Sequence, residues 1–263
     1  MHKPLSLLPD EYLNAYRERQ PFALDKHVAK LKKKGHTVSE FPQNLAQSAV
    51  FSANIEGNPI DYDTYLKYQD LDLKPSNKPF QEIQDLLSAY QYASGKTITL
   101  QRLLEVHQLS TATLLAGTDQ SGEIRSKMVY VYRGAERIYS AMAAEQVPKL
   151  LEELIEEIER LTASKLSLDE CFYYASLLHL RFVHIHPFAD GNGRTGRLLE
   201  KWFLTRCLGE TAWLIYSERY YFQHLKQYYT NINLGPDYES LDYEGCVPFL
   251  LMLPAALRYS YKK

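Results

Sequence analysis

Cysteine is scarce in this sequence: the 263 residues include only Cys171, Cys207 and Cys246. Their number is odd, they lie far apart, and no Cys-x-x-Cys pair occurs. A chain of this length can bury a full core without disulfides or metal ions. Because disulfides persist mainly in oxidising compartments, we expect reduced thiols and a protein of the cytoplasm.

Long apolar runs are missing as well. The longest nearly uncharged stretch, residues 247–257, contains two prolines and is too short to cross a bilayer. Residues 1–13 meet proline and acidic residues too early to form the apolar centre of a signal peptide. We expect a soluble protein that has no membrane partner.

An excess of one charge is also lacking, since 30 lysines and arginines face 32 aspartates and glutamates. This balance argues against a strongly basic nucleic-acid binder and against an acidic disordered tail. Internal repeats, low-complexity tracts and long linkers are absent too. The composition is that of an ordinary globular protein of one or two domains, and we expect no nucleic-acid partner.

Most of the chain shows the apolar spacing of three and four residues that is typical of amphipathic helices. The expected helices cover residues 10–19, 25–34, 43–55, 61–73, 78–95, 99–115, 145–161, 169–183, 196–208, 218–233 and 243–261. Residues 128–138 differ, because β-branched and aromatic residues surround Gly134 there, which indicates a small hairpin. The predicted fold is all-α, with one β-hairpin and an N-terminal helical arm.

Residues 186–197, with the sequence HPFADGNGRTGR, stand apart chemically. Glycines let backbone amides turn toward an anion, and a following helix adds partial positive charge at its first turn. Arg194 and Arg197 lie three apart, so both guanidinium groups can reach one polyphosphate. Asp190 suits a magnesium ion that also binds phosphate oxygens. His186 is the group suited to accept a proton near neutral pH.

Three other interpretations of this stretch were weighed. Gly191, Gly193 and Gly196 match the GxGxxG dinucleotide fingerprint, but that pattern requires a βαβ unit, which the surrounding sequence does not support. His184 and His186 could bind a metal, but no further ligand falls at a supporting spacing. A simple glycine turn between helices would not need the asparagine, the carboxylate and both arginines.

At this point the sequence resembles the Fic (filamentation induced by cAMP) family within the Fic/Doc superfamily. The nine positions that the family motif fixes are all matched: His186, Pro187, Phe188, Asp190, Gly191, Asn192, Gly193, Arg194 and Arg197. The resemblance covers about residues 100–229 and hardly reaches the first forty residues. It implies an N-terminal helical region (1–97), a Fic core (98–240) and a C-terminal helix (241–263).

The resemblance implies a protein adenylyltransferase, which transfers AMP from ATP to a Ser, Thr or Tyr hydroxyl and releases pyrophosphate. His186 would be the general base, Asp190 would hold Mg²⁺, and Phe188 would pack in the core. The nucleotide would contact Asp190, Gly191, Asn192, Gly193, Arg194, Thr195, Gly196 and Arg197. The hairpin would be the flap that positions the target, through Val129, Tyr130, Val131 and Tyr132.

A second short stretch, Ser52 to Gly57, resembles the inhibitory motif of the same family. Ser52 and Glu56 lie four apart and therefore share one helix face. The resemblance implies that Glu56 pairs with Arg197 and misaligns ATP. Such an element within the chain needs no separate antitoxin subunit. In some relatives the equivalent glutamate also helps to remove AMP from a target.

The adenine pocket resembles the family less well. Tyr228 and Tyr229 are similar to paired tyrosines of the family, and Tyr228 could face the base or simply pack in the core. Other activities stay open: transfer of UMP, phosphocholine or phosphate, de-AMPylation, or nucleotide binding with little catalysis. The expected partner is a protein with a reactive hydroxyl, including the chain itself, and a homo-oligomer is compatible with the sequence.

Overall fold

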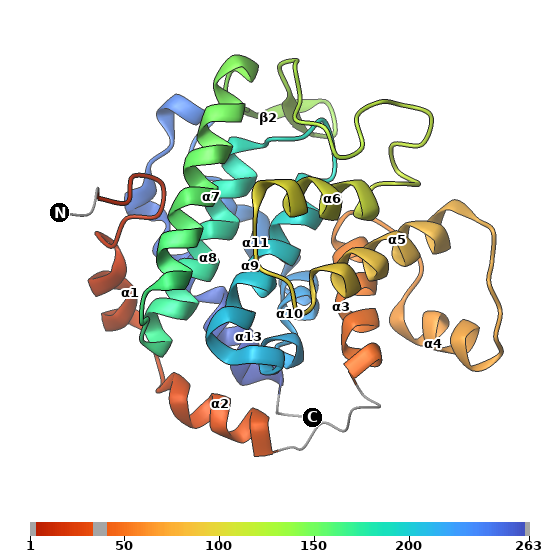
Figure 1. Ribbon diagram of the computed structural model, residues 1–263, viewed down its shortest axis with the longest axis horizontal. Helices are drawn as coiled ribbons and strands as arrows, with labels where there is room; N and C mark the ends of the chain where they lie inside the picture. The colour runs from red at the N-terminus through yellow and green to blue at the C-terminus, as the bar shows by residue number, and fades with distance from the viewer. Residues whose placement is uncertain (1–3, 34–40, 261–263) are drawn as a thin grey trace.

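The computed structural model describes residues 4–33 and 41–260. Two helices, α8 (Leu168–Ile185) and α9 (Asn192–Leu208), run antiparallel through the centre of the molecule (Figure 1). Around them pack α3 (Phe41–Ile55), α5 (Lys78–Ala93), α6 (Leu100–Ser110) and α7 (Val147–Ala163). The prediction of an all-α fold with one hairpin is confirmed.

The remaining α-helices lie outside this central group. They are α1 (Leu13–Arg19), α2 (Leu24–Lys33), α4 (Tyr62–Asp70), α10 (Ser217–Gln223), α11 (Leu225–Ile232), α12 (Val247–Leu250) and α13 (Met252–Ser260). Within the described ranges, no helix combines the length and the apolar character that crossing a membrane would require. The division at residues 97 and 240 stays a prediction.

The hairpin consists of β1 (Tyr130–Arg133) and β2 (Glu136–Ser140), which pair antiparallel. Gly134 makes the turn with a positive φ of 60°, a backbone conformation that favours glycine. A bulge between Val131 and Tyr132 shifts the register. The amide of Ser140 donates to the carbonyl of Pro236 at 2.9 Å, which attaches the hairpin to the segment after α11.

Local sequence chemistry places the ends of the two central helices. Ser167 caps α8 and forms a reciprocal capping box with Glu170. The helix ends at His186, whose φ of 54° is left-handed, and α9 starts after Gly191, whose φ is 77°. The segment 186–191 is therefore a tight connection whose two ends both leave the helical conformation.

Several predicted boundaries differ from the structure. The helix expected over 99–115 begins after its Thr99 cap but ends at Ser110, and α9 begins at Asn192 rather than Gly196. The helix expected over 218–233 is divided at His224 into α10 and α11. The C-terminal stretch holds two short helices, α12 and α13. The predicted helix ends at residues 34 and 261 lie outside the described residues.

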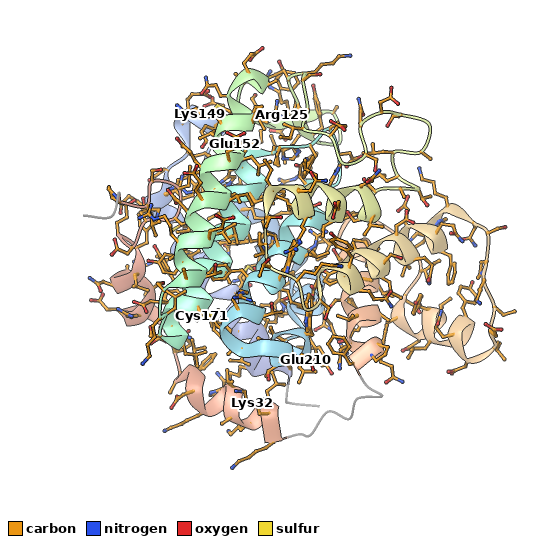
Figure 2. The ribbon with its side chains drawn as sticks, in the orientation of Figure 1. Lys32, Arg125, Lys149, Glu152, Cys171 and Glu210 are labelled. Carbon is orange, nitrogen blue, oxygen red and sulfur yellow. A yellow bond between two sulfur atoms is a disulfide. The ribbon has the colours of Figure 1, made fainter. Side chains whose placement is uncertain are left out.

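The prediction of reduced cysteines is wrong for one pair in this structure. Cys171 and Cys207 form a disulfide with their Cα atoms 6.2 Å apart, whereas Cys246 is free and buried. Cys171 lies near the start of α8 (Figure 2), and Cys207 lies near the end of α9. The antiparallel packing of these helices brings the two residues together although they are 36 apart in sequence.

Candidate active site

A cavity of about 430 Å³ lies where α8, α9, α11, the hairpin and the end of α3 meet. Its lining includes charged, aromatic and backbone groups from all five elements. The predicted site residues among them are Glu56, Val131, Tyr132, His186, Gly193, Arg197 and Tyr228. The structure thus brings together residues that are up to 172 positions apart, from Glu56 to Tyr228.

His186 lies at the C-terminal end of α8 with its ring in a defined tautomer. Its Nδ1 is 3.0 Å from the carbonyl oxygen of Val183, which can only accept, so Nδ1 carries the proton. Nε2 is then the proton acceptor, and His186 lines the cavity. Burial lowers the pKa of His186 below its ordinary value, which keeps the ring neutral near pH 7. The group can therefore accept a proton from a hydroxyl in the cavity.

The loop after His186 is closed by its own side chains and by α6. The amide group of Asn192 donates to the carbonyl of Phe188 and accepts from its N–H, both at 2.9 Å. Phe188 is fully buried, as predicted, and stacks on His107 with ring centroids 3.6 Å apart. His107 accepts the N–H of Gly122 at Nδ1, so its Nε2 donates to the carbonyl of Asp190.

Arg125 fixes the other side of the same loop. Its Nε donates to the carbonyl of His186 at 2.7 Å, and its Nη1 donates to Lys127 at 2.9 Å. Its Nη2 donates to the carbonyls of Met142 and Ile185. One buried guanidinium thus joins both ends of the hairpin segment to the left-handed residue that carries the imidazole. Arg125 lies beside the hairpin segment in Figure 2.

Two glycines of the loop are required for space. A Cβ on Gly191 would lie 2.5 Å from the Thr111 methyl group, and the positive φ already disfavours a side chain there. A Cβ on Gly193 would lie 2.5 Å from Oε1 of Glu56. The bare backbone at residue 193 therefore makes room for a carboxylate that comes from a different helix.

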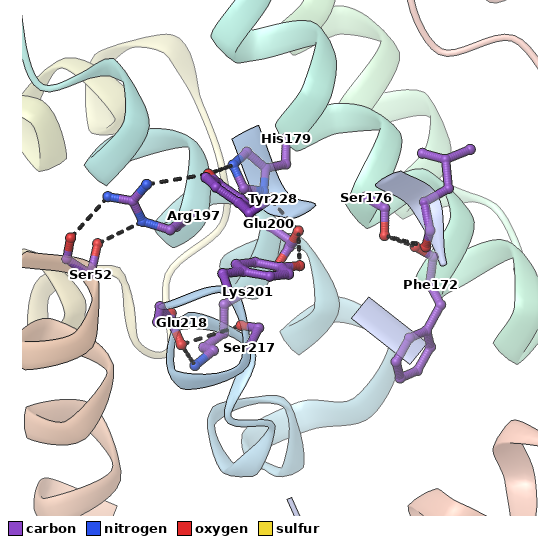
Figure 3. Close-up of polar contacts among 12 residues, drawn as sticks. Ser52, Phe172, Ser176, His179, Arg197, Glu200, Lys201, Ser217, Glu218 and Tyr228 are labelled. Atoms are coloured by element: carbon purple, nitrogen blue, oxygen red, sulfur yellow. Dashed lines mark hydrogen bonds and ion pairs between the residues drawn. The ribbon is translucent and has the colours of Figure 1, made fainter. Parts of the chain in front are cut away.

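Arg197 is held by the last turns of α3. Its Nε donates to the Ser52 hydroxyl and its Nη2 to the Ser52 carbonyl, both at 3.0 Å (Figure 3). Nη2 also pairs with Oε1 of Glu56 at 2.7 Å. Arg197 is 1% exposed, whereas 31% of the Glu56 side chain is exposed toward the cavity. The predicted contact between Glu56 and Arg197 is present.

Arg194 has a different partner. Its Nη2 lies 3.2 Å from Oε2 of Glu82 on α5, and it does not line the cavity. Its Nε and Nη1 are buried without a hydrogen-bond partner in the described chain. Each motif arginine therefore faces one carboxylate, which comes from α3 for Arg197 and from α5 for Arg194.

The other predicted site residues lie around this centre. Asp190 is exposed, does not line the cavity, and its Oδ1 accepts the N–H of Gly191 at 2.6 Å. Thr195 and Gly196 are buried inside α9 and do not line the cavity. In the hairpin, Val131 and Tyr132 line the cavity, whereas Val129 and Tyr130 do not. The nucleotide and target roles of these residues stay predictions.

The ring of Tyr228 is enclosed by other side chains, and its hydroxyl is the part that reaches the site. The ring stacks on Tyr221 and packs against Phe249, and the side chain is 1% exposed. The hydroxyl lies 3.3 Å from Nη1 of Arg197 and 3.0 Å from Nε2 of His179. The structure thus favours the packing interpretation for the ring, while the hydroxyl reaches the site.

The alternatives of a dinucleotide site and a histidine metal site lack support. Gly191 caps α9 and residues 192–196 are its first turns, the preceding element is the helix α8, and the described chain has one two-stranded antiparallel sheet, so no βαβ unit surrounds these glycines. His184 donates from Nε2 to the Ile232 carbonyl and accepts the Tyr243 hydroxyl at Nδ1, which occupies both nitrogens. Across residues 4–33 and 41–260, no cluster of three or more His, Cys, Asp or Glu side chains could hold a metal.

Sequence reasoning missed His107, Arg125 and Glu82. His107 and Arg125 act through backbone carbonyls that are about 60 to 80 positions away. Glu82 reaches Arg194 from 112 positions away. Long-range pairs of this kind leave no local spacing in the sequence, so no periodicity or short motif could have indicated them.

Comparison with known proteins finds relatives for the part of the chain that carries the motif. Residues 97–204 match the model of the Fic/DOC family. Two relatives named "Protein adenylyltransferase Fic", from Culex quinquefasciatus and Drosophila melanogaster, are each 31% identical over 172 and 171 residues. The match covers 61% of this chain and 32% of each relative, so the chain spans about a third of their length.

Solved structures show the same fold. A Fic family protein from Desulfovibrio desulfuricans G20 superposes with a TM-score of 0.73 at 21% identity, covering 99% of this chain and 76% of that one. Fic-1 from C. elegans (residues 134–508) gives a TM-score of 0.65 at 18% identity, covering 95% and 71% of the two chains. At these identities the likeness shows the fold alone.

Proposed function

Since residues 97–204 carry a Fic/DOC family domain, we propose that this protein transfers AMP from ATP to a Ser, Thr or Tyr hydroxyl of a protein and releases pyrophosphate. The observation that carries this proposal is the orientation of His186. Its Nδ1–H is bound to Val183, which leaves Nε2 as the base in a cavity shared with Arg197. A neutral imidazole there can take the proton of an attacking hydroxyl.

The first turn of α9 supplies the oxyanion contacts in this proposal. The N–H groups of Asn192, Gly193 and Arg194 have no acceptor within the helix, because the first intrahelical bond of α9 runs from Thr195 to Gly191. Such amides and the helix dipole favour a phosphate group. They would stabilise the α-phosphate oxygens as charge grows on them during in-line attack, and Arg197 would bind the outer phosphates.

Magnesium belongs to the proposal as part of the nucleotide. Asp190 is an exposed carboxylate, and within the described residues it belongs to no group of three or more His, Cys, Asp or Glu side chains that could hold a metal. Mg²⁺ is commonly bound through one or two carboxylates plus phosphate oxygens and water, so this donor set suits an ATP-bound ion. When bound, the ion neutralises phosphate charge, and Asp190 would hold it at the rim.

Glu56 is proposed as a brake on the reaction. Its carboxylate occupies Nη2 of Arg197 and lies where a side chain on Gly193 would stand. An arginine that donates to Glu56 cannot donate the same N–H to a γ-phosphate, and the carboxylate repels that phosphate. ATP would then bind with its α-phosphate displaced from the line of attack. The exposed part of Glu56 and the single ion pair make the brake reversible.

The hairpin is proposed to hold the protein target. Val131 and Tyr132 line the cavity opposite His186, and β1 pairs with β2 at only one of its edges. An extended segment of a target can add to the other edge through main-chain hydrogen bonds. This arrangement would place a target side chain near Nε2 of His186.

The test compares wild-type protein with Glu56→Gly, each incubated with Mg²⁺ and ATP labelled on the α-phosphate. We expect at least tenfold more label on the protein itself or on lysate proteins with Glu56→Gly, because one ion pair that opposes ATP is removed. His186→Ala in the Glu56→Gly background should abolish the label. Mass spectrometry should find added AMP on a Ser, Thr or Tyr residue.

Matched nucleotides separate the other activities. Label from γ-labelled ATP would indicate phosphate transfer, and label from UTP would indicate UMP transfer. ATP binding in calorimetry without any transfer by Glu56→Gly would indicate a regulatory module. Either of the last two outcomes would overturn the proposal of AMP transfer.

A further inference from the structure

A line of buried polar side chains extends from Arg197 into the core, away from α3. Arg197 makes four hydrogen bonds with the described residues, and three of them go to Ser52 and Glu56 on α3. The fourth runs from Nη1 to the hydroxyl of Tyr228 at 3.3 Å. Behind Tyr228 lie His179 and Glu200, as Figure 3 shows. Among the described residues, each side-chain hydrogen bond of Arg197 other than that to Tyr228 therefore goes to Ser52 on α3 or to Glu56 directly after it.

The direction of each bond in this line follows from the donors available. Arginine only donates, so the Tyr228 oxygen accepts from Arg197 and its single proton goes to Nε2 of His179 at 3.0 Å. Nε2 then accepts, so Nδ1 carries a proton and donates to Oε2 of Glu200 at 2.9 Å. Glu200 also accepts the Tyr221 hydroxyl. No member of this line lacks a partner, and each is at most 1% exposed.

We propose that Tyr228, supported by His179 and Glu200, is the positioning residue that keeps Arg197 directed at the γ-phosphate after Glu56 releases it. This inference rests on the function proposed above. ATP can take the Nη2 N–H that Glu56 occupies only when that ion pair is given up. The guanidinium then keeps its bonds to Ser52 at Nε and Nη2 and its bond to Tyr228 at Nη1. Loss of the Tyr228 bond would return rotamer freedom to this long side chain, which costs binding free energy when it is ordered again.

The buried carboxylate makes this support stronger than an isolated tyrosine would. The carboxylate of Glu200 polarises the ring of His179, which strengthens the hydrogen bond that the Tyr228 hydroxyl donates to His179. The Tyr228 oxygen thereby becomes a better acceptor for Arg197. Hydrogen bonds in which one partner is charged are about twice as strong as neutral ones. The same logic applies when a carboxylate orients a histidine behind a reacting group. Here the group that is oriented is a phosphate-binding arginine.

The experiment measures ATP and ADP binding by calorimetry in the Glu56→Gly background, in which Arg197 is free of the brake. ADP lacks the γ-phosphate, so the ratio of the two affinities reports on contacts to that phosphate, and its change between Glu56→Gly and Glu56→Gly with Tyr228→Phe isolates the contribution of Tyr228. We expect Tyr228→Phe to weaken ATP binding about tenfold and ADP binding less than twofold. In transfer assays, KM for ATP should rise about tenfold with kcat within threefold, because uniform binding is lost.

Two further variants keep the test decisive. Glu200→Gln retains hydrogen bonds but removes the charge, and it should weaken ATP binding about threefold with ADP binding unchanged. Tyr173→Phe removes another buried hydroxyl, which donates to the Pro9 carbonyl far from the cavity, and should leave the ratio of affinities unchanged.

Equal weakening of ATP and ADP by Tyr228→Phe, or no weakening, would overturn the positioning role. Failure of the proposed function gives a different result. If Glu56→Gly itself transfers no AMP, the reaction is wrong, but the affinities for ATP and ADP still report whether Tyr228 positions Arg197.

Discussion

The cavity has two opposite walls that are built in different ways. The loop from His186 to Asn192 is held by buried side chains from elsewhere in the fold, through Arg125, His107 and its own Asn192. The hairpin is held at its base by one buried hydroxyl, from Tyr139 to the His184 carbonyl, and by the amide of Ser140. Its outer side chains are open to solvent, with Tyr132 58% exposed.

This contrast separates the two tasks of the proposed reaction. A nucleotide presents the same phosphate groups in every reaction, and a loop fixed by several buried hydrogen bonds can match them without reorganising during the reaction. A protein target varies more in sequence, and main-chain pairing along an exposed strand tolerates that variation. We therefore expect substitutions that loosen the loop to impair the reaction strongly, and single substitutions in the hairpin to impair it weakly.

The largest expected effect is that of Arg125→Ala in the Glu56→Gly background. Arg125 binds carbonyls of the loop and of both ends of the hairpin segment, so its guanidinium joins the two walls directly. Its loss frees the left-handed His186 and misplaces Nε2. We expect AMP transfer to fall about 100-fold, equivalent to about 2.7 kcal/mol, mostly in kcat.

Arg125→Lys controls for folding. Lysine retains one charged donor but not the planar fork, so it should recover part of the activity, while circular dichroism should find both variants folded. A folded Arg125→Ala protein with the parental kcat would show that the loop keeps its geometry unaided.

An effect of intermediate size is expected from pH, because buried histidines beside the loop make the free energy of unfolding sensitive to acid. Burial lowers the pKa of His107 from 6.5 to about 4 and that of His184 to about 3. Below pH 6.5 these histidines become protonated in the unfolded chain but stay neutral in the folded chain. The free energy of unfolding therefore has its full value above that pH and falls as the pH drops toward 4. Each histidine contributes a slope of up to about 1.4 kcal/mol per pH unit. The hairpin, residues 130–140, contains no histidine.

Urea unfolding between pH 7 and 4.5 checks this. In His107→Gln, whose amide can still donate to the Asp190 carbonyl, the dependence on pH should be shallower than in the wild type. Glu136→Gln in the hairpin is the matched control and should leave the slope unchanged. An unchanged slope in His107→Gln would mean that this histidine is not held neutral by burial.

How much the sequence could predict follows the same division between local and distant contacts. The helices α3, α5, α7 and α8 and the hairpin follow from periodicity, because each is a local pattern. The residues of 186–197 are contiguous, so their spacing alone could indicate a candidate phosphate site, and that role stays a prediction. The start of α9 was placed four residues late, because a glycine at its cap and two more in its first turns hide the helical signal.

Apart from the pair of Glu56 and Arg197, which the family resemblance implies, contacts between distant residues could not be predicted. Nothing near His186 indicates Arg125, and nothing near Arg197 indicates that Tyr228, His179 and Glu200 form one line. The pairing of Cys171 with Cys207 likewise depends on how α8 packs against α9. Such contacts are decided by tertiary packing, which a single sequence does not encode in its spacing.

The smallest expected effect is that of single side chains in the hairpin. Tyr132 lines the cavity, whereas Tyr130 on the same strand does not, so the two form a matched pair of exposed tyrosines. In the Glu56→Gly background, Tyr132→Ala should lower AMP incorporation into lysate proteins about threefold, which is below 1 kcal/mol, with KM for ATP unchanged. Tyr130→Ala should lower AMP incorporation less, because main-chain pairing survives both changes.

A loss of tenfold or more with Tyr132→Ala, or any rise in KM for ATP, would mean that the hairpin also contacts the nucleotide or recognises one specific target side chain. In that case single substitutions in the hairpin would impair the reaction as much as those in the loop, and the two walls would not differ in the way proposed here.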